Sequence, residues 1–251
     1  MGFTKFWSGT FSQDPELNRK INEFKNTVTI FTNSVYDTST IFSNEAFSSL
    51  FECLEVTLNE AKNQPDTLFV IRAHPDEYRA SVTKKDRQQK SMELIEDWLK
   101  EKGYLNLTNL YFVSPLEFIS SYQLVALSKF IIVYNSTIGL EALMTGKRLL
   151  MGGKSKYSCI SYLAPIKTQD AYLNRLRGYI DAEAVEVSKE EINEARALFY
   201  KLFFETSTDF SWALQNDDKL GGAVSFKDFN LNLLHADKNK HIDNLIGTVL
   251  N

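Results

Sequence analysis

The segment FIIVYNSTIGLEALMTGKRLLMGG, residues 130–153, contains a complete strand–helix–strand pattern. It begins with an apolar run, 130–133, and passes through Asn-Ser-Thr into apolar residues at helical spacing, 138–145, that end at Gly146. A second strand is predicted over 147–151, before a Gly-Gly pair. Short apolar runs bounded by turn residues are typical of strands buried on both faces, and such strands occur mostly in parallel sheets covered by helices. The segment therefore predicts one unit of a parallel α/β sheet.

The same alternation of strands and helices extends toward the amino terminus. Short β-branched and aromatic runs predict three further strands, over 27–32, 68–71 and 110–113. Apolar residues at helical spacing predict the helices that follow them, over 44–62, 91–102 and 117–128. Elements that alternate in this way predict an α/β fold, with a Rossmann-like parallel sheet and helices on both faces.

The pattern divides the chain into three parts. We expect residues 26–188 to form the Rossmann-like nucleotide-binding domain, preceded by residues 1–25 as a helical lead-in or former interdomain linker. Residues 189–251 are predicted to form a helical carboxy-terminal extension. Its aromatic stripe is most simply a core or a contact surface between domains, and it becomes an exposed patch if the partner domain is absent. The stripe consists of Phe199, Phe203, Phe210 and Trp212.

Composition limits the classes of partner. The chain has 251 residues, 43% of them hydrophobic, which is enough for a sizeable core. Its 28 Lys and Arg residues against 32 Asp and Glu residues give a net charge of -4 without long single-sign runs, so we expect no nucleic-acid partner. Two cysteines without partner spacing, Cys53 and Cys159, indicate a reducing compartment.

We therefore expect a cytoplasmic protein. The first residues lack the apolar core and cleavage site of a secretory signal. No window approaches the roughly 18 apolar residues that span a bilayer, so membrane contact is expected to be at most peripheral, at the inner face of the membrane.

Polar residues gather where the predicted strands end. The loops after the five strands read TNSVYDTS, RAHPDEYR, SPLE, YNSTIGLEA and GGKSKY. Parallel strands end at one edge of their sheet, and ligands of open α/β sheets bind outside that edge. The sequence therefore predicts that any polar chemistry lies at this carboxyl edge.

His74 leads these candidates. It follows the predicted strand 68–71 and precedes Pro75, which holds the preceding residue extended. An imidazole there is able to donate a hydrogen bond to a phosphate oxygen. The alternative is a structural histidine that caps the next turn through Asp76 or Glu77. Arg72, in the same loop, is a weaker candidate for phosphate binding.

Asn135, Ser136 and Thr137 stand where the fourth predicted helix begins. Serine or threonine at this point normally caps the helix, which is the plainer interpretation. The functional interpretation adds the backbone amides of Ile138 and Gly139 to the two hydroxyls, which together would surround a phosphate. Glu141, one turn further on, is then placed to accept hydrogen bonds from a ribose, although it is also an ordinary solvated helix residue in the plainer interpretation.

The remaining candidates are weaker, and several common site types are absent. A Gly-Gly turn with surface lysines is the plain account of Lys154 and its neighbours. No Gly-x-Gly-x-x-Gly follows a strand and no Gly-Lys-Ser/Thr loop occurs, which disfavours a dinucleotide oxidoreductase and an ATPase. The histidines are too scattered to predict a metal site, and no cofactor is expected. The weaker candidates are Asn33, Asp37, Ser114, Glu117 and Lys154.

Two of these segments together resemble a known family. RAHPDEYR, followed by YNSTIGLEALMTGKRLLMGG, is similar to the carboxy-terminal, donor-binding half of bacterial capsule and surface polysaccharide biosynthesis proteins of the GT-B type. These include the Kdo transferases of capsule export systems and, more distantly, polysialyltransferases and CDP-glycerol transferases. The resemblance extends over roughly residues 25–160 and includes the TIFTNSVYDTS strand and loop.

The resemblance implies a function and assigns roles to residues. His74, Ser136 and Thr137 would hold the phosphates of a CMP-, CDP- or UDP-linked sugar, and Glu141 would help to fix the sugar of the nucleotide. The implied chemistry is metal-independent glycosyl transfer with inversion to a glycan or glycolipid acceptor. The amino-terminal acceptor half of the GT-B fold, which normally carries the catalytic base, has no counterpart in this sequence, so the catalytic residues stay unassigned.

Two alternatives follow from that difference. In the first alternative, the chain is a non-catalytic truncated module that works with a separate acceptor-domain protein or as a homo-oligomer. In the second it is a nucleotide-sugar epimerase, which shares the phosphate site and needs acidic residues from both domains.

Overall fold

The computed structural model describes residues 14–34, 43–78, 94–163, 166–205, 214–216, 224–228, 230–235 and 237–250. The candidate Asp37 and two residues of the aromatic stripe, Phe210 and Trp212, lie outside these ranges.

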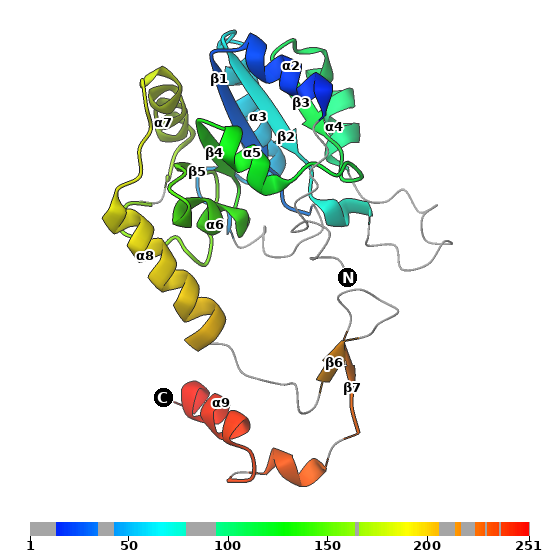
Figure 1. Cartoon of the computed structure of the whole chain (residues 1–251), viewed down its shortest axis with the longest axis vertical. Helices are drawn as coiled ribbons and strands as arrows, with labels where there is room; N and C mark the ends of the chain where they lie inside the picture. Colours follow the sequence, from blue (N-terminus) through cyan, green and yellow to red (C-terminus); the bar gives the residue numbers. More distant parts are fainter. Residues whose placement is uncertain are drawn as a thin grey trace. The chain divides into compact units, whose positions relative to one another are not determined.

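The core of the protein is a parallel sheet of five strands in the order β3-β2-β1-β4-β5 (Figure 1). In register, Val28 of β1 lies between Phe69 of β2 and Phe130 of β4. The prediction of a Rossmann-like parallel sheet is confirmed. The strands are β1 (Asn26–Phe31), β2 (Thr67–Arg72), β3 (Leu110–Val113), β4 (Phe130–Val133) and β5 (Leu149–Met151).

Helices cover both faces of this sheet, because each strand carries apolar residues on both sides. Val28 and Ile30 pack into a core cluster shared with α3, α4 and α7, whereas the Thr29 hydroxyl points to the other face and bonds Ser128 at the end of α5 at 2.7 Å. In Figure 1, α5 lies in front of the sheet and α3 behind it. The helices of this part are α2 (Pro15–Glu23), α3 (Leu50–Ala61), α4 (Ile95–Glu101), α5 (Ser121–Leu127), α6 (Ile138–Met144) and α7 (Gln169–Asp181).

Capping residues set the helix ends. The helix predicted over 44–62 begins only at Leu50, because Ser49 is extended and its hydroxyl accepts the Glu52 amide at 3.1 Å. The helix predicted over 117–128 likewise begins after Ser120. Gly146, with φ 83°, adopts the left-handed conformation that ends α6 and turns the chain toward β5.

The carboxy-terminal part differs from the prediction in one respect. It contains α8 (Lys189–Tyr200), a π-helical turn (Lys201–Glu205) and α9 (Lys240–Leu250), and also a short antiparallel pair, β6 (Leu214–Asn216) with β7 (Val224–Phe226). The extension is therefore not entirely helical. Of the described residues, those from 14 to 198 belong to one compact unit and those from 199 onward belong to a second. No helix in the described ranges has the length and apolarity to cross a membrane.

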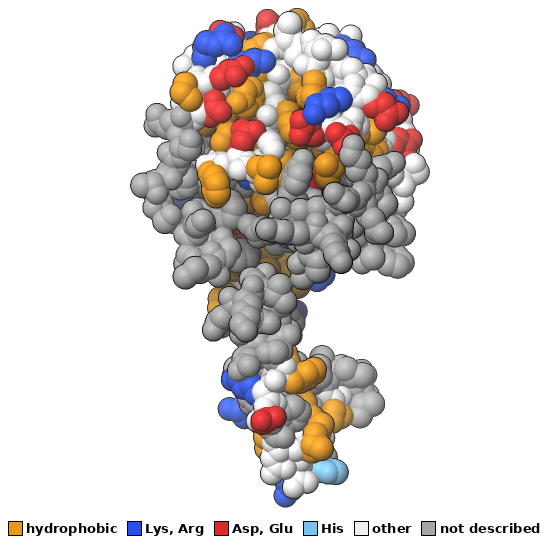
Figure 2. Space-filling view, turned by 90° about the vertical axis from the view of Figure 1, so that its right-hand side faces the viewer, with side chains coloured by type: hydrophobic (Ala, Val, Ile, Leu, Met, Phe, Trp, Pro, Cys, Tyr) orange, Lys and Arg blue, Asp and Glu red, His pale blue; other side chains and the backbone are white. Residues whose placement is uncertain are grey.

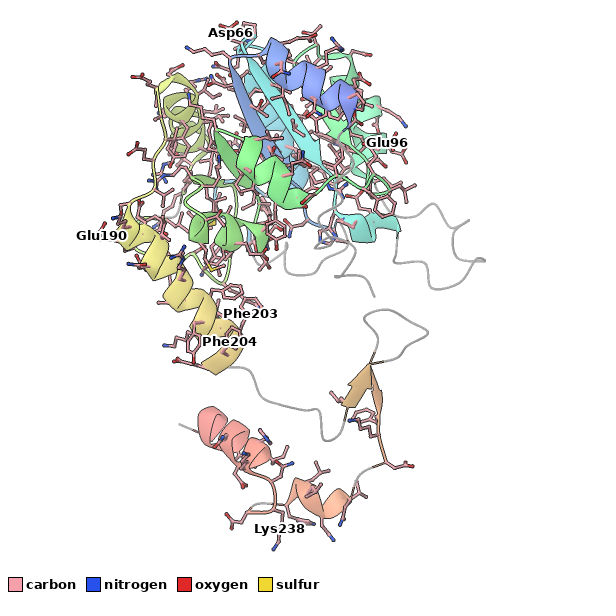
Figure 3. All side chains as sticks on the ribbon, in the orientation of Figure 1. Asp66, Glu96, Glu190, Phe203, Phe204 and Lys238 are labelled. Carbon is pink, nitrogen blue, oxygen red and sulfur yellow. The ribbon has the colours of Figure 1, made fainter. Side chains whose placement is uncertain are left out.

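The surface of the sheet-containing unit mixes charges of both signs. Figure 2 shows acidic and basic side chains interspersed with hydrophobic ones on the face that it displays. In the second unit, the Phe199 and Phe203 rings pack with centroids 4.5 Å apart. Phe203 and Phe204 follow α8 (Figure 3), and 66% of Phe204 is exposed.

Candidate functional site

The order of the strands places the candidate site. From β1 the chain moves outward to β2 and β3, then returns to the opposite side of β1 for β4 and β5. The direction in which successive strands are added to the sheet therefore reverses between β1 and β4. Ligands of open α/β sheets bind at such a point, beyond the carboxyl ends of the strands. The loop after β1 carries Asn33 and Ser34, and the loop after β4 carries Asn135, Ser136 and Thr137.

Two side chains after β1 are buried without a hydrogen-bond partner. Asn33 is 6% exposed and Ser34 is 7% exposed. Within the described part of the chain, neither Asn33 Oδ1 nor Ser34 Oγ has a partner. Native proteins keep few such atoms, because each unsatisfied group costs about 1–3 kcal/mol. The carboxyl edge therefore holds two buried acceptors whose hydrogen-bonding capacity is unused. Asn33 was among the weaker sequence candidates, and Ser34 was missed although it is its direct neighbour.

The loop after β4 is held in place by hydrogen bonds. The Tyr134 hydroxyl donates to Asn44 Oδ1 at 2.5 Å, and Asn135 Nδ2 donates to Ser43 Oγ at 2.6 Å. The Tyr157 hydroxyl donates to the Ser136 carbonyl at 2.6 Å. Asn135 thus anchors the loop to the segment that precedes α3, and these contacts fix the backbone from which Ser136 and Thr137 extend.

Thr137 does not act as an ordinary helix cap. It is the first residue before α6, but its φ of -60° and ψ of -27° are helical and its side chain makes no capping hydrogen bond. The Thr137 side chain is exposed at the carboxyl edge. Helix capping, the plainer interpretation, therefore does not account for the Thr137 hydroxyl.

Gly139 has a different role from the predicted one. Its amide donates to the Ser136 carbonyl at 3.1 Å, so this amide is not available to a phosphate. A Cβ at this position would lie 3.0 Å from Leu149 Cδ2 and closer still to the Tyr157 hydroxyl oxygen. Gly139 is therefore required for close packing of α6 against β5 and Tyr157.

We predict that Gly139→Ala lowers the free energy of unfolding by about 1–3 kcal/mol, the usual cost of an added methyl in a packed site. Chemical denaturation of the variant measures this. Gly178→Ala is the matched control, because nothing lies within 4 Å of a Cβ at that helical position. Equal stability of Gly139→Ala and the unmodified protein would contradict the packing role.

Glu141 already has a protein partner at the carboxyl edge. Its carboxylate accepts a short hydrogen bond from the Tyr122 hydroxyl, which joins α6 to α5. Burial and this hydrogen bond raise the pKa of Tyr122, so the phenol stays protonated and keeps donating at neutral pH. A contact from Glu141 to a ribose would have to coexist with this bond.

His74 lies on the other side of β1 from Ser136. It is half-buried after β2, and its carbonyl accepts the Glu77 amide at 3.1 Å in the 3₁₀ turn Pro75–Tyr78. Neighbouring strands are about 4.8 Å apart, and β2 and β4 flank β1. The loops that carry His74 and Ser136 are therefore about 10 Å apart along the same edge, with the loop of Asn33 and Ser34 between them.

Three of the weaker candidates form a network with one another. Arg72 is 2% exposed, and its guanidinium donates to the carbonyls of Ser114 at 2.5 Å and Glu117 at 3.2 Å. The Glu117 carboxylate in turn accepts the Ser114 amide at 2.9 Å. Burial lowers the pKa of Arg72, partly offset by the charges of Glu117 and Glu77. Arg72 holds the loop after β3 in place.

Glu77 was named from the sequence only as a possible partner of His74, not as a site residue. The residue is 7% exposed. One oxygen of its carboxylate accepts the Ile95 amide at 3.4 Å, and the other is unpaired among the described residues. Burial raises the pKa of Glu77 to about 7, against the hydrogen bonds to Ile95 and His74 that lower it. A run of HPDE gives no indication that its glutamate turns inward.

The raised pKa of Glu77 predicts a pH-dependent stability. Because the folded state binds the proton more tightly than the unfolded state, the free energy of unfolding falls as the pH rises from about 4.5 to about 7 and is constant above. Glu77→Gln removes this loss and is expected to stabilise the protein at pH 8 by on the order of 2 kcal/mol. Urea denaturation of the unmodified protein and of Glu77→Gln at pH 5 and pH 8 measures how far the free energy of unfolding falls in each. An unchanged pH dependence in the variant would show that another group is responsible.

Lys154 lies next to the loop after β4, because Ser43 contacts both Lys154 and Asn135. It follows β5, its side chain is exposed, and it lines a depression bounded by residues of β5 and α7. Its backbone amide donates to the Ser43 carbonyl at 2.8 Å. Among the residues that the structure describes, no three His, Cys, Asp or Glu side chains are grouped as metal ligands would be.

Comparison with solved structures finds several similar chains of low identity. Thermosulfurimonas dismutans KpsC, a beta Kdo 2,7 transferase, is 17% identical with a TM-score of 0.39, and the match covers 77% of this chain and 64% of that one. The beta Kdo 2,4 transferase of the same KpsC is 14% identical with a TM-score of 0.41, over 73% and 56% of the two chains. UDP-GlcNAc 2-epimerase from Neisseria meningitidis, bound to UDP-GlcNAc, is 14% identical with a TM-score of 0.41, over 79% and 47%. The present chain thus spans less than two thirds of each of these proteins.

Comparison with curated protein sequences finds no match. Comparison with family models finds one that covers the sheet and both loops that carry His74 and Ser136. Residues 10–162, more than half of the chain, match the model described as capsule polysaccharide biosynthesis protein. The chain belongs to the capsule polysaccharide biosynthesis protein family.

Proposed function

We propose that this chain binds a nucleotide sugar, CMP-, CDP- or UDP-linked, and is the donor-binding part of a GT-B glycosyltransferase of capsular or surface polysaccharide biosynthesis. The observation that carries the proposal is the pair of buried acceptors Asn33 Oδ1 and Ser34 Oγ, which are unpaired within the described residues. Both follow β1, where the order in which strands are added to the sheet reverses. A ligand with hydroxyl or amide donors satisfies both atoms, and the Ser34 hydroxyl is itself able to donate to a phosphate oxygen.

The neighbouring loops supply the rest of the proposed site. Ser136 and Thr137 contribute hydroxyl donors from one side and His74 an imidazole from the other, so the nucleotide phosphates lie across the end of β1. Hydrogen-bond donors fixed in this way stabilise the charge that develops on a departing nucleotide. In the proposed reaction an acceptor hydroxyl forms a bond to the anomeric carbon, the bond to the nucleotide phosphate breaks, and a base takes the hydroxyl proton.

The proposed base and acceptor site lie outside the residues assigned here. We propose that an acceptor domain supplies them, from a longer form of the protein, a separate chain or a second copy. The proposed acceptor is a glycan or glycolipid, and the proposed location is the cytoplasm, at the inner face of the membrane. We propose that the transfer needs no metal or other cofactor, with the hydroxyl and imidazole donors stabilising the departing phosphate instead.

A thermal-shift panel of CMP, CDP, UDP, GDP and NAD tests the proposal, since a ligand that binds only the folded state raises the melting temperature. At least one pyrimidine nucleotide is expected to raise it, and Thr137→Val and His74→Ala are each expected to weaken that nucleotide about tenfold. Thr108→Val is the matched control, because Thr108 is also exposed but precedes β3 at the opposite end of the strands. A shift with NAD alone, or equal losses in Thr137→Val and Thr108→Val, would contradict the proposal.

A further inference from the structure

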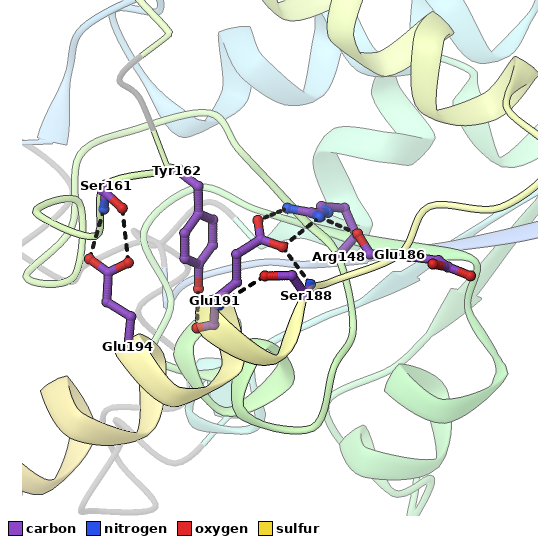
Figure 4. Close-up of polar contacts among 7 residues, drawn as sticks. All are labelled: Arg148, Ser161, Tyr162, Glu186, Ser188, Glu191 and Glu194. Carbon is purple, nitrogen blue, oxygen red and sulfur yellow. Dashed lines mark hydrogen bonds and ion pairs between the residues drawn. The ribbon is translucent and has the colours of Figure 1, made fainter.

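Two carboxylates at the start of α8 use both of their oxygens to bond the protein. The oxygens of Glu191 accept hydrogen bonds from Arg148 at 2.6 and 3.1 Å, and one of them also accepts the Ser188 amide at 2.6 Å (Figure 4). The oxygens of Glu194 accept the Ser161 amide at 3.0 Å and its hydroxyl at 2.9 Å. These contacts attach α8 to the sheet-containing unit, so both carboxylates are structural.

Glu141 at the carboxyl edge differs from these two carboxylates. Its Oε2 accepts the short hydrogen bond from the Tyr122 hydroxyl, whereas its Oε1 makes no hydrogen bond within the part of the chain that the structure describes. A carboxylate oxygen accepts hydrogen bonds and never donates them while it is ionised. The contacts of Glu141 therefore leave one oxygen able to accept a donor from a ligand.

Helix geometry places Glu141 beside the proposed phosphate-binding side chains. The Glu141 amide donates to the Thr137 carbonyl at 3.4 Å, and residues four apart in a helix are neighbours on one face, with about 5–6 Å between their Cβ atoms. Burial raises the pKa of Tyr157, whose hydroxyl bonds the Ser136 carbonyl at 2.6 Å, and the nearby charge of Glu141 adds to this shift. A nucleotide whose phosphate contacts Thr137 would therefore bring its ribose to Glu141.

Tyr122 restricts the orientation of the Glu141 carboxylate. It lies in the first turn of α5, which begins where the Ser120 hydroxyl accepts the Gln123 amide at 3.4 Å and which is seated on the sheet by the buried Leu124. The terminal torsion of a glutamate is otherwise broad, so a hydrogen bond to one oxygen also limits where the other oxygen points. Ordering an acceptor before the ligand arrives lowers the entropy cost of binding.

We propose that Tyr122 is a positioning residue for nucleotide recognition, and that the Tyr122–Glu141 pair reads a ribose hydroxyl. One hydroxyl of the ribose donates to Glu141 Oε1 while Oε2 stays bonded to Tyr122. The site then selects ribonucleotides over the deoxyribonucleotides that lack this hydroxyl. The inference rests on the proposed function, because a nucleotide must first occupy the carboxyl edge.

Calorimetric titration of the whole chain with CMP, its 2′-deoxy form and its 3′-deoxy form tests the inference, with the same three forms of UMP as a second set. For the base that binds, the unmodified protein is expected to prefer the ribonucleotide about tenfold or more over one of the two deoxy forms, because a hydrogen bond to a charged group is lost. A preference below about threefold over both deoxy forms would overturn the inference.

Variants assign the preference to the pair. Tyr122→Phe keeps the ring and removes the donor, so it is expected to reduce the preference for the ribonucleotide about threefold or more and to leave the affinity for the deoxy form within about twofold. Glu141→Ala is expected to abolish the preference. A structural role alone would weaken every form alike and keep their ratio. An unchanged or larger preference in Tyr122→Phe would overturn the positioning role.

Tyr111→Phe is the matched control. The Tyr111 hydroxyl donates to Asp14 Oδ2 at 3.0 Å, and Asp14 Oδ1 accepts the amides of Glu16 and Leu17, so this tyrosine–carboxylate pair has no unused oxygen. Tyr111→Phe is expected to leave the preference for the ribonucleotide within about twofold of that of the unmodified protein. Equal reductions in Tyr111→Phe and Tyr122→Phe would reject the assignment to the Tyr122–Glu141 pair.

The absolute affinities separate this inference from the proposed function. If none of the nucleotides binds, the proposed function fails and the inference fails with it. If the ribonucleotide binds and Ser34→Ala weakens it, while Tyr122→Phe leaves the ratio between the forms unchanged, the proposed function stands and the inference alone is rejected.

Discussion

Arg72→Met is expected to lower the free energy of unfolding by about 3–5 kcal/mol. Methionine has a similar length but no donors, so it leaves the partly buried carbonyls of Ser114 and Glu117 without the guanidinium that they now share. Each unpaired buried acceptor costs about 1–3 kcal/mol. Guanidinium chloride denaturation of the variant and the unmodified protein gives the difference directly.

The control for Arg72 is an arginine whose ion pair is exposed. Arg19 pairs with Glu23 on the surface of α2, with 59% of its side chain accessible. Arg19→Met is expected to cost less than about 1 kcal/mol, as exposed pairs usually do. A cost for Arg72→Met no larger than that for Arg19→Met would show that the loop after β3 does not depend on the guanidinium.

Ser34→Ala is expected to have opposite effects on stability and on binding. Removing a buried hydroxyl without a partner should raise the free energy of unfolding of the ligand-free protein by about 1–2 kcal/mol. The same change should weaken the nucleotide about tenfold, because a hydrogen bond to its phosphate or ribose is lost. Denaturation without ligand and calorimetry with the preferred nucleotide measure the two quantities on one preparation.

Thr32→Val provides the matched control in the same loop. The Thr32 hydroxyl is also buried, but it donates to the Arg72 carbonyl at 3.4 Å. Its removal should therefore lower the free energy of unfolding by about 0.5–1.5 kcal/mol and leave nucleotide affinity unchanged. If Ser34→Ala behaves like Thr32→Val in both measurements, the Ser34 hydroxyl is a structural group and not part of a binding site.

The sheet was predictable because its signal is local. Each strand is a short run of mostly apolar residues, so the apolar pattern alone marks 27–32, 68–71, 110–113 and 130–133 to within a residue or two. Helix starts were less predictable, since Ser49 and Ser120 set them through cap hydrogen bonds that the apolar spacing does not reveal. The pair β6–β7 was missed because two three-residue strands leave no periodic pattern.

The candidate site was predictable in position and not in detail. The parallel strand order puts the loops that carry His74, Ser136 and Thr137 at one edge of the sheet. That these residues bind a ligand stays a prediction. The partners of each side chain depend on the tertiary structure. For that reason the sequence did not reveal that Arg72 bonds the loop after β3, or that Glu77 is buried.

The most direct test is an experimental structure of this chain with CMP or UDP bound. The proposed function predicts a phosphate or ribose oxygen within about 3.2 Å of Ser34 Oγ, and a phosphate oxygen within the same distance of the Ser136 or Thr137 hydroxyl. A nucleotide found at the amino-terminal ends of the strands, or at the carboxyl edge with Ser34 Oγ still unpaired, would contradict it.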